Sequence, residues 1–367
     1  MSLKVKIIGA GSIGNHLAFA SRQMGWSVDI YDIDHDALLR TKDQIYPDRY
    51  GKWDETINLY KIDKNPNISY DLVIIGTPPE THVTLAQEAI NQGAKAVLIE
   101  KPAATPNLKG VQELFQLYKN TSCKVFVGYN HTVGRSVKKM TELLSQNVIG
   151  KIQTLDVEFR EHWGGIFLAH PWLKGPSDSY LGFWEKGGGS CGEHSHAINL
   201  WQHYAKIAGM GRVVDVNANL EYINDGKLNY DSLSLINLKT ENGFLGRVVQ
   251  DVVTRPNRKW ARAQGENGFL EWYCDQKKGV DTVLFDDNRN KVTEFEVKKN
   301  RPDDFYQKMK HINDILNGKI IHSPITLESG LDTMLVISAA HISAKYKKSV
   351  EIDYSKGYVL DAISVKN

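Results

Sequence analysis

The chain contains few cysteines and no excess of charge of either sign. Its 367 residues include 3 cysteines, Cys123, Cys191 and Cys274. An odd number at wide spacing argues against a disulfide framework and favours a reducing compartment. Lys and Arg total 45 against 43 for Asp and Glu, which leaves a formal net charge of +2, and no basic run would follow a nucleic-acid backbone. We therefore expect no nucleic acid among its partners.

Long hydrophobic runs are also lacking. The longest apolar stretches, such as those in residues 71–79 and 94–102, have the length of strands and are too short to span a membrane. The N-terminus has no apolar segment that is preceded by positive charge and followed by a small-residue cleavage site. The sequence therefore predicts a cytoplasmic protein without a membrane partner.

The apolar content is nevertheless sufficient for two cores, since 41% of the residues are hydrophobic. Strand-like and helix-like segments alternate up to about residue 124 and predict a doubly wound parallel sheet. Beyond about residue 150, longer alternating runs joined by Gly, Asn and Asp predict an antiparallel sheet, followed by two helices and a short strand. We expect an α/β domain over residues 1–124 and an α+β domain with a large, open, mainly antiparallel sheet over 125–367.

A glycine-rich turn lies between the first apolar strand and the following helix. It carries the pattern G-x-G-x-x-G in Gly9, Gly11, Ser12, Ile13 and Gly14. The tight turn, the close approach of backbone to a pyrophosphate and the helix–strand packing each exclude a side chain, and the helix N-terminus faces the anion. Asp32 ends the second strand, where a carboxylate binds both ribose hydroxyls and repels a 2′-phosphate. These residues predict a Rossmann domain that binds NAD rather than NADP, although Asp32 also fits a solvated turn.

A more specific pattern follows the turn. The segment GTPPETHVTLAQEAINQGAKAVLIEKP spans residues 76–102. Together with GAGSIG it resembles the Gfo/Idh/MocA family of nicotinamide-dependent sugar oxidoreductases, and the resemblance extends to ARAQGENGFLEW and VISAAHISA in the second domain. The resemblance implies that residues of this segment also hold the cofactor: Thr77, Pro78, His82, Glu100 and Lys101.

Lys101 is the residue that the resemblance places beside both the nicotinamide and the substrate, before a cis peptide bond to Pro102. The residue type and position support this placement independently, because open α/β sheets bind their ligands at the carboxyl ends of the strands. A surface lysine paired with Glu100 is the alternative interpretation.

The segment GGGSCGEHSHAINLW, residues 187–201, resembles the second signature of the family. There a glycine pair is followed by an aspartate and, four residues later, by a catalytic histidine. His196 falls on that histidine, but Gly192 occupies the aspartate position. Glu193 lies three residues before His196, a spacing that puts two side chains on neighbouring faces of one helix. We expect Glu193 either to replace the missing carboxylate or to be a helix N-terminal acid that stabilises the helix dipole.

The chemistry of alcohol oxidation assigns roles to these residues. An alcohol that gives up hydride needs a base for its proton and a cation for the developing alkoxide. His196 near a helix N-terminus should have a lowered pKa and act as the base, while Lys101 supplies the cation. The bare backbone of residues 187–189 should lie close to the substrate or the nicotinamide.

Further residues are candidates for holding a sugar, because aromatic rings suit its C–H faces and polar tips suit its hydroxyls. The aromatic-rich segment 159–184 supplies two of them, although packing against the sheet or a neighbouring subunit explains this segment equally well. The resemblance places the junction after the fifth strand near the substrate, with His131 where many relatives have arginine. The candidates are Tyr129, Asn130, Arg160, Trp172 and His194, of which His194 fits a structural role equally well.

A metal site is not expected. Glu193, His194, His196 and His203 lie close in sequence, but they lack the His-x-x-x-His or Cys-x-x-Cys spacing of metal sites. Cys191 does not complete a tetrahedral set on the same helix face.

We predict an NAD-dependent dehydrogenase that transfers hydride between nicotinamide and a secondary alcohol of a sugar, sugar acid, cyclitol or sugar nucleotide. Two alternatives remain. One is a redox-neutral epimerase or eliminase that uses transient oxidation, and the other is a non-catalytic NAD-binding regulator, which Gly192 favours and Lys101 and His196 oppose. Since the open sheet of the family usually pairs with its copy, we expect a homodimer or homotetramer.

Overall fold

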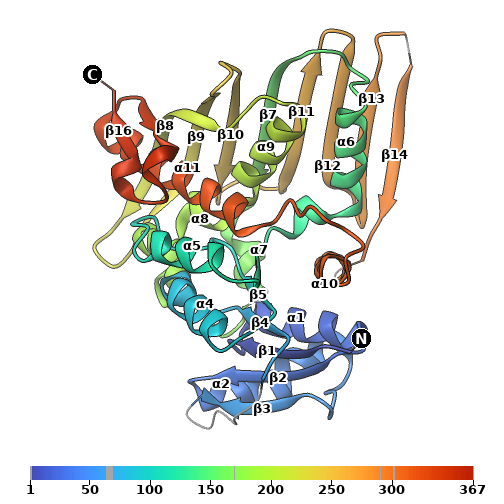
Figure 1. Cartoon of the computed structure of the whole chain (residues 1–367), viewed down its shortest axis with the longest axis vertical. Helices are drawn as coiled ribbons and strands as arrows, with labels where there is room; N and C mark the ends of the chain where they lie inside the picture. Colours follow the sequence, from blue (N-terminus) through green and yellow to red (C-terminus); the bar gives the residue numbers. More distant parts are fainter. Residues whose placement is uncertain (1, 63–68, 169, 290, 301, 367) are drawn as a thin grey trace.

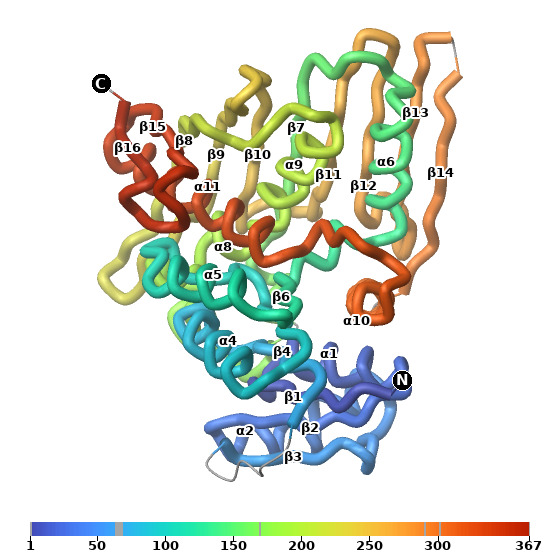
Figure 2. The backbone as a smooth tube through the Cα atoms, viewed as in Figure 1, coloured from blue at the N-terminus to red at the C-terminus, as the bar shows by residue number. Residues whose placement is uncertain are grey.

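The computed structural model of the chain describes residues 2–62, 69–168, 170–289, 291–300 and 302–366 (Figure 1). Two sheets follow each other along the chain, and Figure 2 shows the backbone in the same view. The first part contains β1 (Lys4–Ile8), α1 (Ser12–Gln23), β2 (Ser27–Asp32), α2 (His35–Arg40), η1 (Thr41–Ile45), α3 (Tyr46–Tyr50), β3 (Asn58–Lys61), β4 (Leu72–Ile75), η3 (Pro79–Thr81), α4 (His82–Asn91), β5 (Ala96–Ile99), α5 (Val111–Lys119) and β6 (Lys124–Val127).

The second part begins at η4 and runs to the C-terminus. It contains η4 (Asn130–Val133), α6 (Arg135–Ser145), β7 (Ile152–Arg160), α7 (Trp163–Leu168), η5 (Pro176–Asp178), η6 (Tyr180–Gly182), η7 (Trp184–Lys186), α8 (Gly189–Glu193), α9 (His196–Ile207), β8 (Val213–Asn224), β9 (Asn229–Thr240), β10 (Leu245–Asp251), β11 (Arg258–Gly265), β12 (Gly268–Lys277), β13 (Val280–Asp286), β14 (Val292–Lys298), α10 (Asp303–Leu316), α11 (Leu327–Tyr346), β15 (Val350–Ile352), η8 (Tyr354–Lys356), η9 (Leu360–Ala362) and β16 (Ile363–Val365). None of the described helices combines the length and apolar character needed to cross a bilayer.

In the described part of the chain, six strands form a parallel sheet in the order β3-β2-β1-β4-β5-β6. The strands β4 and β5 are uninterrupted apolar runs, and these two strands and β1 are buried along nearly their whole length, as expected for a parallel sheet covered on both faces. The predicted doubly wound sheet is confirmed. The sequence analysis missed β3, because this edge strand is exposed or half-buried and lacks such an apolar run.

A second sheet of ten strands in the described residues has the order β14-β13-β12-β11-β7-β10-β9-β8-β15-β16. Its neighbouring strands are antiparallel except β7 and β10, so the predicted large, mainly antiparallel sheet is confirmed. The alternating sequence runs from which we predicted this sheet did not include strands β11, β14 and β16. Figure 1 shows α6 and α9 lying along one face of the sheet, where α6 packs on β12 and β13, α9 on β7, and α11 on β8.

The two parts share a hydrophobic core instead of meeting only at a linker. The strand β6 of the parallel sheet crosses the expected boundary at residue 124, and its last residue, Val127, donates a backbone hydrogen bond of 2.9 Å to Ile325. From the C-terminal half, α10 packs on α1 and α11 packs on β6 and α5. The parallel sheet therefore takes part of its helical cover from the end of the chain.

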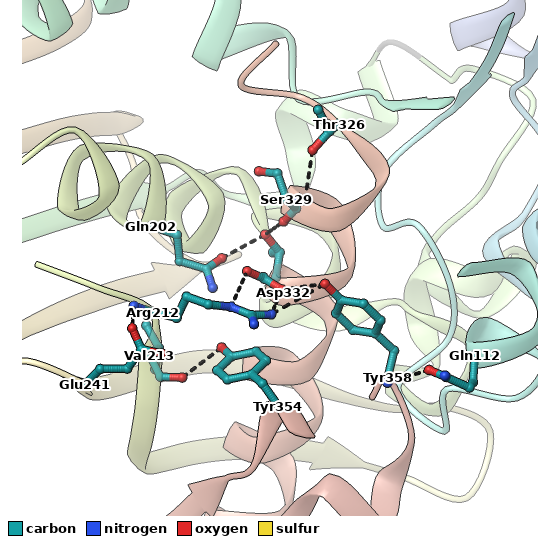
Figure 3. Close-up of polar contacts among 11 residues, drawn as sticks. Gln112, Gln202, Arg212, Val213, Glu241, Thr326, Ser329, Asp332, Tyr354 and Tyr358 are labelled. Carbon is teal, nitrogen blue, oxygen red and sulfur yellow. Dashed lines mark hydrogen bonds and ion pairs between the residues drawn. The ribbon is translucent and has the colours of Figure 1, made fainter. Parts of the chain in front are cut away.

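The polar contacts in Figure 3 hold the C-terminal tail, which contains Tyr354 and Tyr358, against the rest of the molecule. Arg212, just before β8, forms two hydrogen bonds of 3.1 and 2.6 Å with the carboxylate of Asp332 on α11. The hydroxyl of Tyr354 donates to the carbonyl of Val213 at 2.8 Å, and the backbone N–H of Tyr358 donates to the side chain of Gln112 at 2.8 Å. These contacts fix the tail against both parts of the molecule.

A buried ion pair forms a further link between the two parts. Lys308 of α10 is 0% exposed and donates to the carboxylate of Glu100, which directly follows β5. Gly128 leaves room for this carboxylate, because a Cβ at that position would lie 2.4 Å from Oε2 of Glu100. The pair therefore determines where the loop after β5 lies relative to α10.

Replacing Lys308 with methionine should destabilise the protein, because the Glu100 carboxylate would remain buried without a counter-charge. We expect the free energy of unfolding, measured by urea denaturation, to fall by about 3–5 kcal/mol. Lys310→Ala is the matched control, since it removes a half-exposed ion pair with Asp314 on the same helix and should cost less than about 1 kcal/mol. A Lys308→Met variant as stable as the wild type would contradict the expectation, and adding Glu100→Gln should recover part of the loss.

Candidate active site

The glycine turn forms the N-terminus of α1, with Gly11 as its N-cap residue. Two of the glycines are needed for packing, because a Cβ on Gly9 would lie 2.7 Å from the carbonyl oxygen of Gly76 and one on Gly14 would lie 2.0 Å from that of Gly9. A Cβ on Gly11, in contrast, would meet nothing within 4 Å. An open, side-chain-free turn at a helix N-terminus without acidic residues in its first turn fits the pyrophosphate of a dinucleotide.

Two charged residues flank this turn. Asp32 ends β2, and its carboxylate accepts hydrogen bonds from the backbone N–H groups of Ala10 at 2.7 Å and Asp34 at 2.9 Å. Arg49 of α3 donates to the carbonyl and the hydroxyl of Ser12, at 3.0 and 2.8 Å. The guanidinium adds positive charge beside the helix N-terminus. The sequence analysis missed Arg49, because nothing in the local pattern of α3 connects it with the turn.

The loop after β4 lies beside the turn and carries Thr77 and Pro78. Its conformation is supported by His82 at the start of α4, whose ring nitrogens lie 2.7 Å from the carbonyl oxygen of Thr77 and 2.9 Å from that of Pro102. His82 is 1% exposed and thus connects the loops that follow β4 and β5. His82 therefore supports the two loops that carry the other candidates by contacting the backbone of both.

Lys101 extends from the loop after β5 into the second part of the molecule. The expected cis peptide bond between Lys101 and Pro102 is present. Nζ of Lys101 lies 2.9 Å from Oε2 of Glu193 and donates a hydrogen bond of 2.9 Å to the backbone carbonyl of the same residue. The alternative pairing of Lys101 with Glu100 is not formed, since the Glu100 carboxylate accepts from Lys308 instead.

Glu193 and His196 belong to two different helices, so the expectation that they share one helix is wrong. Glu193 is the last residue of α8, His196 is the first of α9, and the chain turns between them. Glu193 therefore lies outside the first turn of α9, which also contradicts the alternative that it serves the dipole of that helix. The carboxylate of Glu193 pairs instead with the ammonium of Lys101.

The backbone leaves no space for a side chain at Gly192, the residue that the resemblance aligns with the family's aspartate. A Cβ on Gly192 would lie 1.9 Å from the carbonyl oxygen of Gly187. The glycines of residues 187–189 also make close contacts with the protein itself: a Cβ on Gly187 would touch Pro79 and Pro102 at 3.1 Å, and one on Gly189 would lie 2.0 Å from Asp231. The bare backbone lets this segment pack tightly against the nucleotide-binding part.

His196 combines a packed ring with a buried nitrogen that has no protein partner. Its ring lies against those of Tyr129, His131 and Phe159, at centroid distances of 5.6, 4.9 and 6.0 Å. Nδ1 is buried and has no hydrogen-bond partner among the described residues. Burial, followed by the charges of His131 and Lys101, holds the pKa of His196 well below its ordinary value. The sequence analysis expected a lowered pKa from the helix N-terminus, whereas the main cause in the structure is burial.

The residues after β6 contribute one wall of this site. Tyr129 is fully buried and borders His196, and Asn130 and His131 open the short helix η4. His131 contacts both His196 and Phe159. The sequence analysis had noted His131 as a departure from its relatives, and the structure brings it directly to the candidate base.

Polar residues at the end of β7 and the start of β11 pair with Asp251, His194 and one another. Nε of Arg160 lies 2.6 Å from Oδ2 of the buried Asp251, so its guanidinium is held at the end of β10. His194 is buried with Nε2 3.4 Å from the carbonyl oxygen of Glu161. The Glu161 carboxylate lies 2.8 Å from Nζ of Lys259 on β11. The sequence analysis did not identify Lys259, because its proximity to the site depends on the pairing of β11 with β7.

Trp172 is the candidate that the structure does not bring to this cluster. Its ring lies 5.2 Å from the guanidinium of Arg40 on α2 and 5.4 Å from the ring of His170. Arg40 follows the strand that ends in Asp32, so Trp172 packs on the nucleotide-binding part. The aromatic-rich loop thus contacts the first domain through this residue.

Comparisons with protein-family models cover most of the chain. Residues 3–129 match a model described as an oxidoreductase family with an NAD-binding Rossmann fold. Residues 137–271 match the GFO/IDH/MocA C-terminal domain.

Curated relatives match shorter segments. The chain is 26% identical over 178 residues to a myo-inositol 2-dehydrogenase of Thermotoga maritima, a match that covers 45% of this chain and 51% of the relative. It is 26% identical over 186 residues to a 1-carboxy-3-chloro-3,4-dihydroxycyclohexa-1,5-diene dehydrogenase of Comamonas testosteroni, covering 50% of this chain and 42% of the relative. The matches thus span about half the length of these proteins.

Solved structures match over nearly the whole chain. A levoglucosan dehydrogenase in complex with NADH and levoglucosan has a TM-score of 0.75 at 18% identity, with coverage of 96% of this chain and 99% of the other. GenD2 from gentamicin A biosynthesis, in complex with NAD, has a TM-score of 0.73 at 17% identity, with coverage of 96% of each chain. At such low identity these likenesses establish the shared fold.

Restoring the family aspartate by Gly192→Asp should damage the site, because its Cβ would collide with the carbonyl of Gly187. Gly192→Ala creates the same collision without a charge and should destabilise the protein by at least about 1–3 kcal/mol, measured by thermal or urea unfolding. Gly175→Ala is the control, since its φ of 174° is extended and its Cβ would meet nothing within 4 Å. Wild-type stability of Gly192→Ala would show that the segment rearranges freely.

Proposed function

The chain belongs to the Gfo/Idh/MocA family of NAD-binding oxidoreductases, and we propose that it transfers hydride between NAD and a secondary alcohol of a sugar or cyclitol. The observation that carries this proposal is the cluster of Lys101, Glu193 and His196. The ammonium of Lys101 is held by Glu193, and it is close enough to His196 to lower the pKa of that imidazole. This cluster supplies the cation and the base that alcohol oxidation requires.

In the oxidation direction the proposed roles are as follows. Bound NAD would supply the acceptor for the hydride that leaves the alcohol carbon. His196, neutral because its pKa is lowered, accepts the hydroxyl proton. Lys101 stabilises the negative charge that develops on the same oxygen, and Glu193 keeps the ammonium in place. In the reverse direction, His196 returns the proton as the carbonyl is reduced.

The free nitrogen of His196 argues against a protein that only senses NAD. Burying a polar atom without a partner costs about 1–3 kcal/mol. NAD binding by the glycine turn alone does not explain why the protein buries this nitrogen without a partner. A substrate hydroxyl that hydrogen-bonds to Nδ1 would supply the missing partner.

A polyhydroxylated substrate is supported by the polar walls of the site and by the relatives. The imidazoles of His131 and His194 and the ammonium of Lys259 lie near His196. One curated relative is a myo-inositol 2-dehydrogenase, and one matching structure holds levoglucosan. We therefore propose a sugar or cyclitol as the class of substrate and do not propose a particular compound.

Glu193→Gln should fold and bind NAD normally but lower turnover by about 10²–10⁴-fold, because the amide removes the charge that holds Lys101. His196→Ala should lose at least as much, and the double variant little more, since groups that act as a unit are not additive. The measurement is turnover on a panel of sugars and cyclitols, followed by NADH absorbance and by product mass, so that redox-neutral turnover is also detected. Calorimetry with NAD and with NADP checks cofactor binding and the preference that Asp32 predicts.

Glu142→Gln is the matched control for this experiment, because Glu142 pairs with Lys139 on the exposed side of α6. A fully active Glu193→Gln with an inactive His196→Ala would show that His196 and Lys101 act without the carboxylate. Full activity of both variants on the true substrate would refute the proposed site. Product without accumulated NADH would identify the reaction as epimerisation or elimination.

We further propose that the protein acts as a homo-oligomer in the cytoplasm, paired through the face of the large sheet that lies opposite the helices. On β9, Ile236 is buried, whereas its neighbour Leu235 points to the opposite face and is 43% exposed. Leu245 of β10, which pairs with Lys239 of β9, lies on the same face and is 63% exposed. Apolar side chains exposed together on a broad sheet are typical of an interface.

Leu235→Lys combined with Leu245→Lys should therefore convert an oligomer into monomers, because two charges would enter the interface. Light scattering at micromolar concentration measures the mass of wild type and variant. Ile321→Lys is the control, since Ile321 is 84% exposed and lies away from the sheet. A monomeric wild type would contradict the proposal.

A further inference from the structure

A cluster of ligand-type side chains lies buried next to α8. Sγ of Cys191, a carboxylate oxygen of Asp231 and a ring nitrogen of His341 all lie within 4.8 Å of one another. Cys191 belongs to α8, Asp231 to β9 and His341 to α11, and the three residues are 0, 0 and 4% exposed. Three elements that are far apart in the sequence thus bring a thiol, a carboxylate and an imidazole to one buried point.

Two polar atoms in this cluster have no hydrogen-bond partner among the described residues. Oδ2 of Asp231 accepts from the backbone N–H of Cys191 at 2.7 Å and from two serine hydroxyls, whereas Oδ1 accepts from none. Nδ1 of His341 lies 2.7 Å from the hydroxyl oxygen of Tyr222, whereas Nε2 has no partner. Since a buried polar atom without a partner is unfavourable, both atoms indicate a ligand that would satisfy them.

The chemistry of the three groups selects the kind of ligand. A thiolate and an imidazole are donors for transition metals, whereas magnesium and calcium prefer oxygen atoms alone. A thiolate and a carboxylate carry one negative charge each, so with a neutral imidazole they would balance a divalent cation. That balance matters in a fully buried site, where uncompensated charge is strongly unfavourable.

We propose that Cys191, Asp231 and His341 bind a zinc ion. Zinc binds such donors at about 2.0–2.3 Å in a tetrahedron, which places ligand atoms roughly 3.5 Å apart. The three groups would therefore have to approach one another by about 1 Å from their present separation of up to 4.8 Å. The hydroxyl of Ser234, 3.1 Å from Sγ of Cys191, or a water molecule completes the fourth position.

Proton positions in the cluster are consistent with this assignment. When Nδ1 of His341 donates its proton to the oxygen of Tyr222, Nε2 keeps a lone pair for the ion, which is the usual arrangement of a metal-binding histidine. Burial and the nearby Asp231 raise the pKa of the Cys191 thiol. A bound cation reverses that effect, so binding releases the thiol proton to solvent.

The ion would fix α8 from the side of β9 and α11. The start of α8 already lies against Asp231, since a Cβ on Gly189 would be 2.0 Å from Oδ1. Glu193 at the end of the same short helix pairs with Lys101. The zinc site thus supports the position of Glu193, but its existence does not depend on the proposed reaction.

Elemental analysis of the full-length protein, purified from zinc-supplemented medium and gel-filtered, should find about one zinc per chain. Cys191→Ser, Asp231→Asn and His341→Gln should each lose it. Cys274→Ser and His203→Gln are the matched controls, because they replace a half-buried thiol and a half-buried imidazole outside the cluster, and they should keep the zinc.

Cobalt substitution of the wild type keeps the test decisive if a variant fails to fold. After removal of zinc with a chelator, added Co²⁺ should give a thiolate-to-cobalt charge-transfer band, and added Zn²⁺ should raise the unfolding temperature. A protein that takes up no metal and shows no such band would overturn the proposal. Zinc that remains in folded variants of all three ligands would overturn it as well, since the ion would then lie elsewhere.

Discussion

Two neighbouring side chains after β5 hold the candidate site together. Glu100 pairs with Lys308 of α10 and Lys101 pairs with Glu193 of α8, so one loop carries two ion pairs to the second part of the molecule. Charged groups that leave water cost several kcal/mol each unless they are paired. The loop is therefore fixed at the carboxyl end of the parallel sheet, which is where such sheets bind their ligands. This constraint sets the distance between the cofactor site and His196.

The same packing leaves no space for a side chain at Gly192, which the resemblance aligns with the family's aspartate. The segment that contains residues 187–192 is pressed against itself and against Pro79 and Pro102 of the first part, which excludes a side chain at position 192. A carboxylate is still present at the ammonium of Lys101, but it comes from the next residue and from a longer side chain. The carboxylate that pairs with Lys101 thus comes from one position later along the chain than the resemblance implies.

The short helix α8 connects the two buried clusters of the second part. Its residue Cys191 points to Asp231 and His341, and its last residue, Glu193, reaches Lys101. A helix of this length has little stability of its own. Its place depends on what its side chains bind on either side, so the geometry at Lys101 is coupled to the packing around Asp231.

The sequence by itself determined the two folds and the glycine turn, and it selected Lys101 and His196 as candidate site residues. Each of these depends on local signals, namely apolar runs of strand length, the spacing of glycines before a helix, and a specific pattern around Glu-Lys-Pro. Strands without an apolar run, such as β3, escaped that analysis for the same reason.

Only the tertiary structure decided the partners of these residues. The break between α8 and α9 separates Glu193 from His196, the pairing of β11 with β7 brings Lys259 near the site, and β9 and α11 supply Asp231 and His341 beside Cys191. The sequence argued against a metal on the spacing of residues within one helix, whereas these ligand-type groups come from three elements. Spacing along a chain predicts contacts within a helix or a turn, and contacts between distant elements are fixed only when the sheets and helices pack.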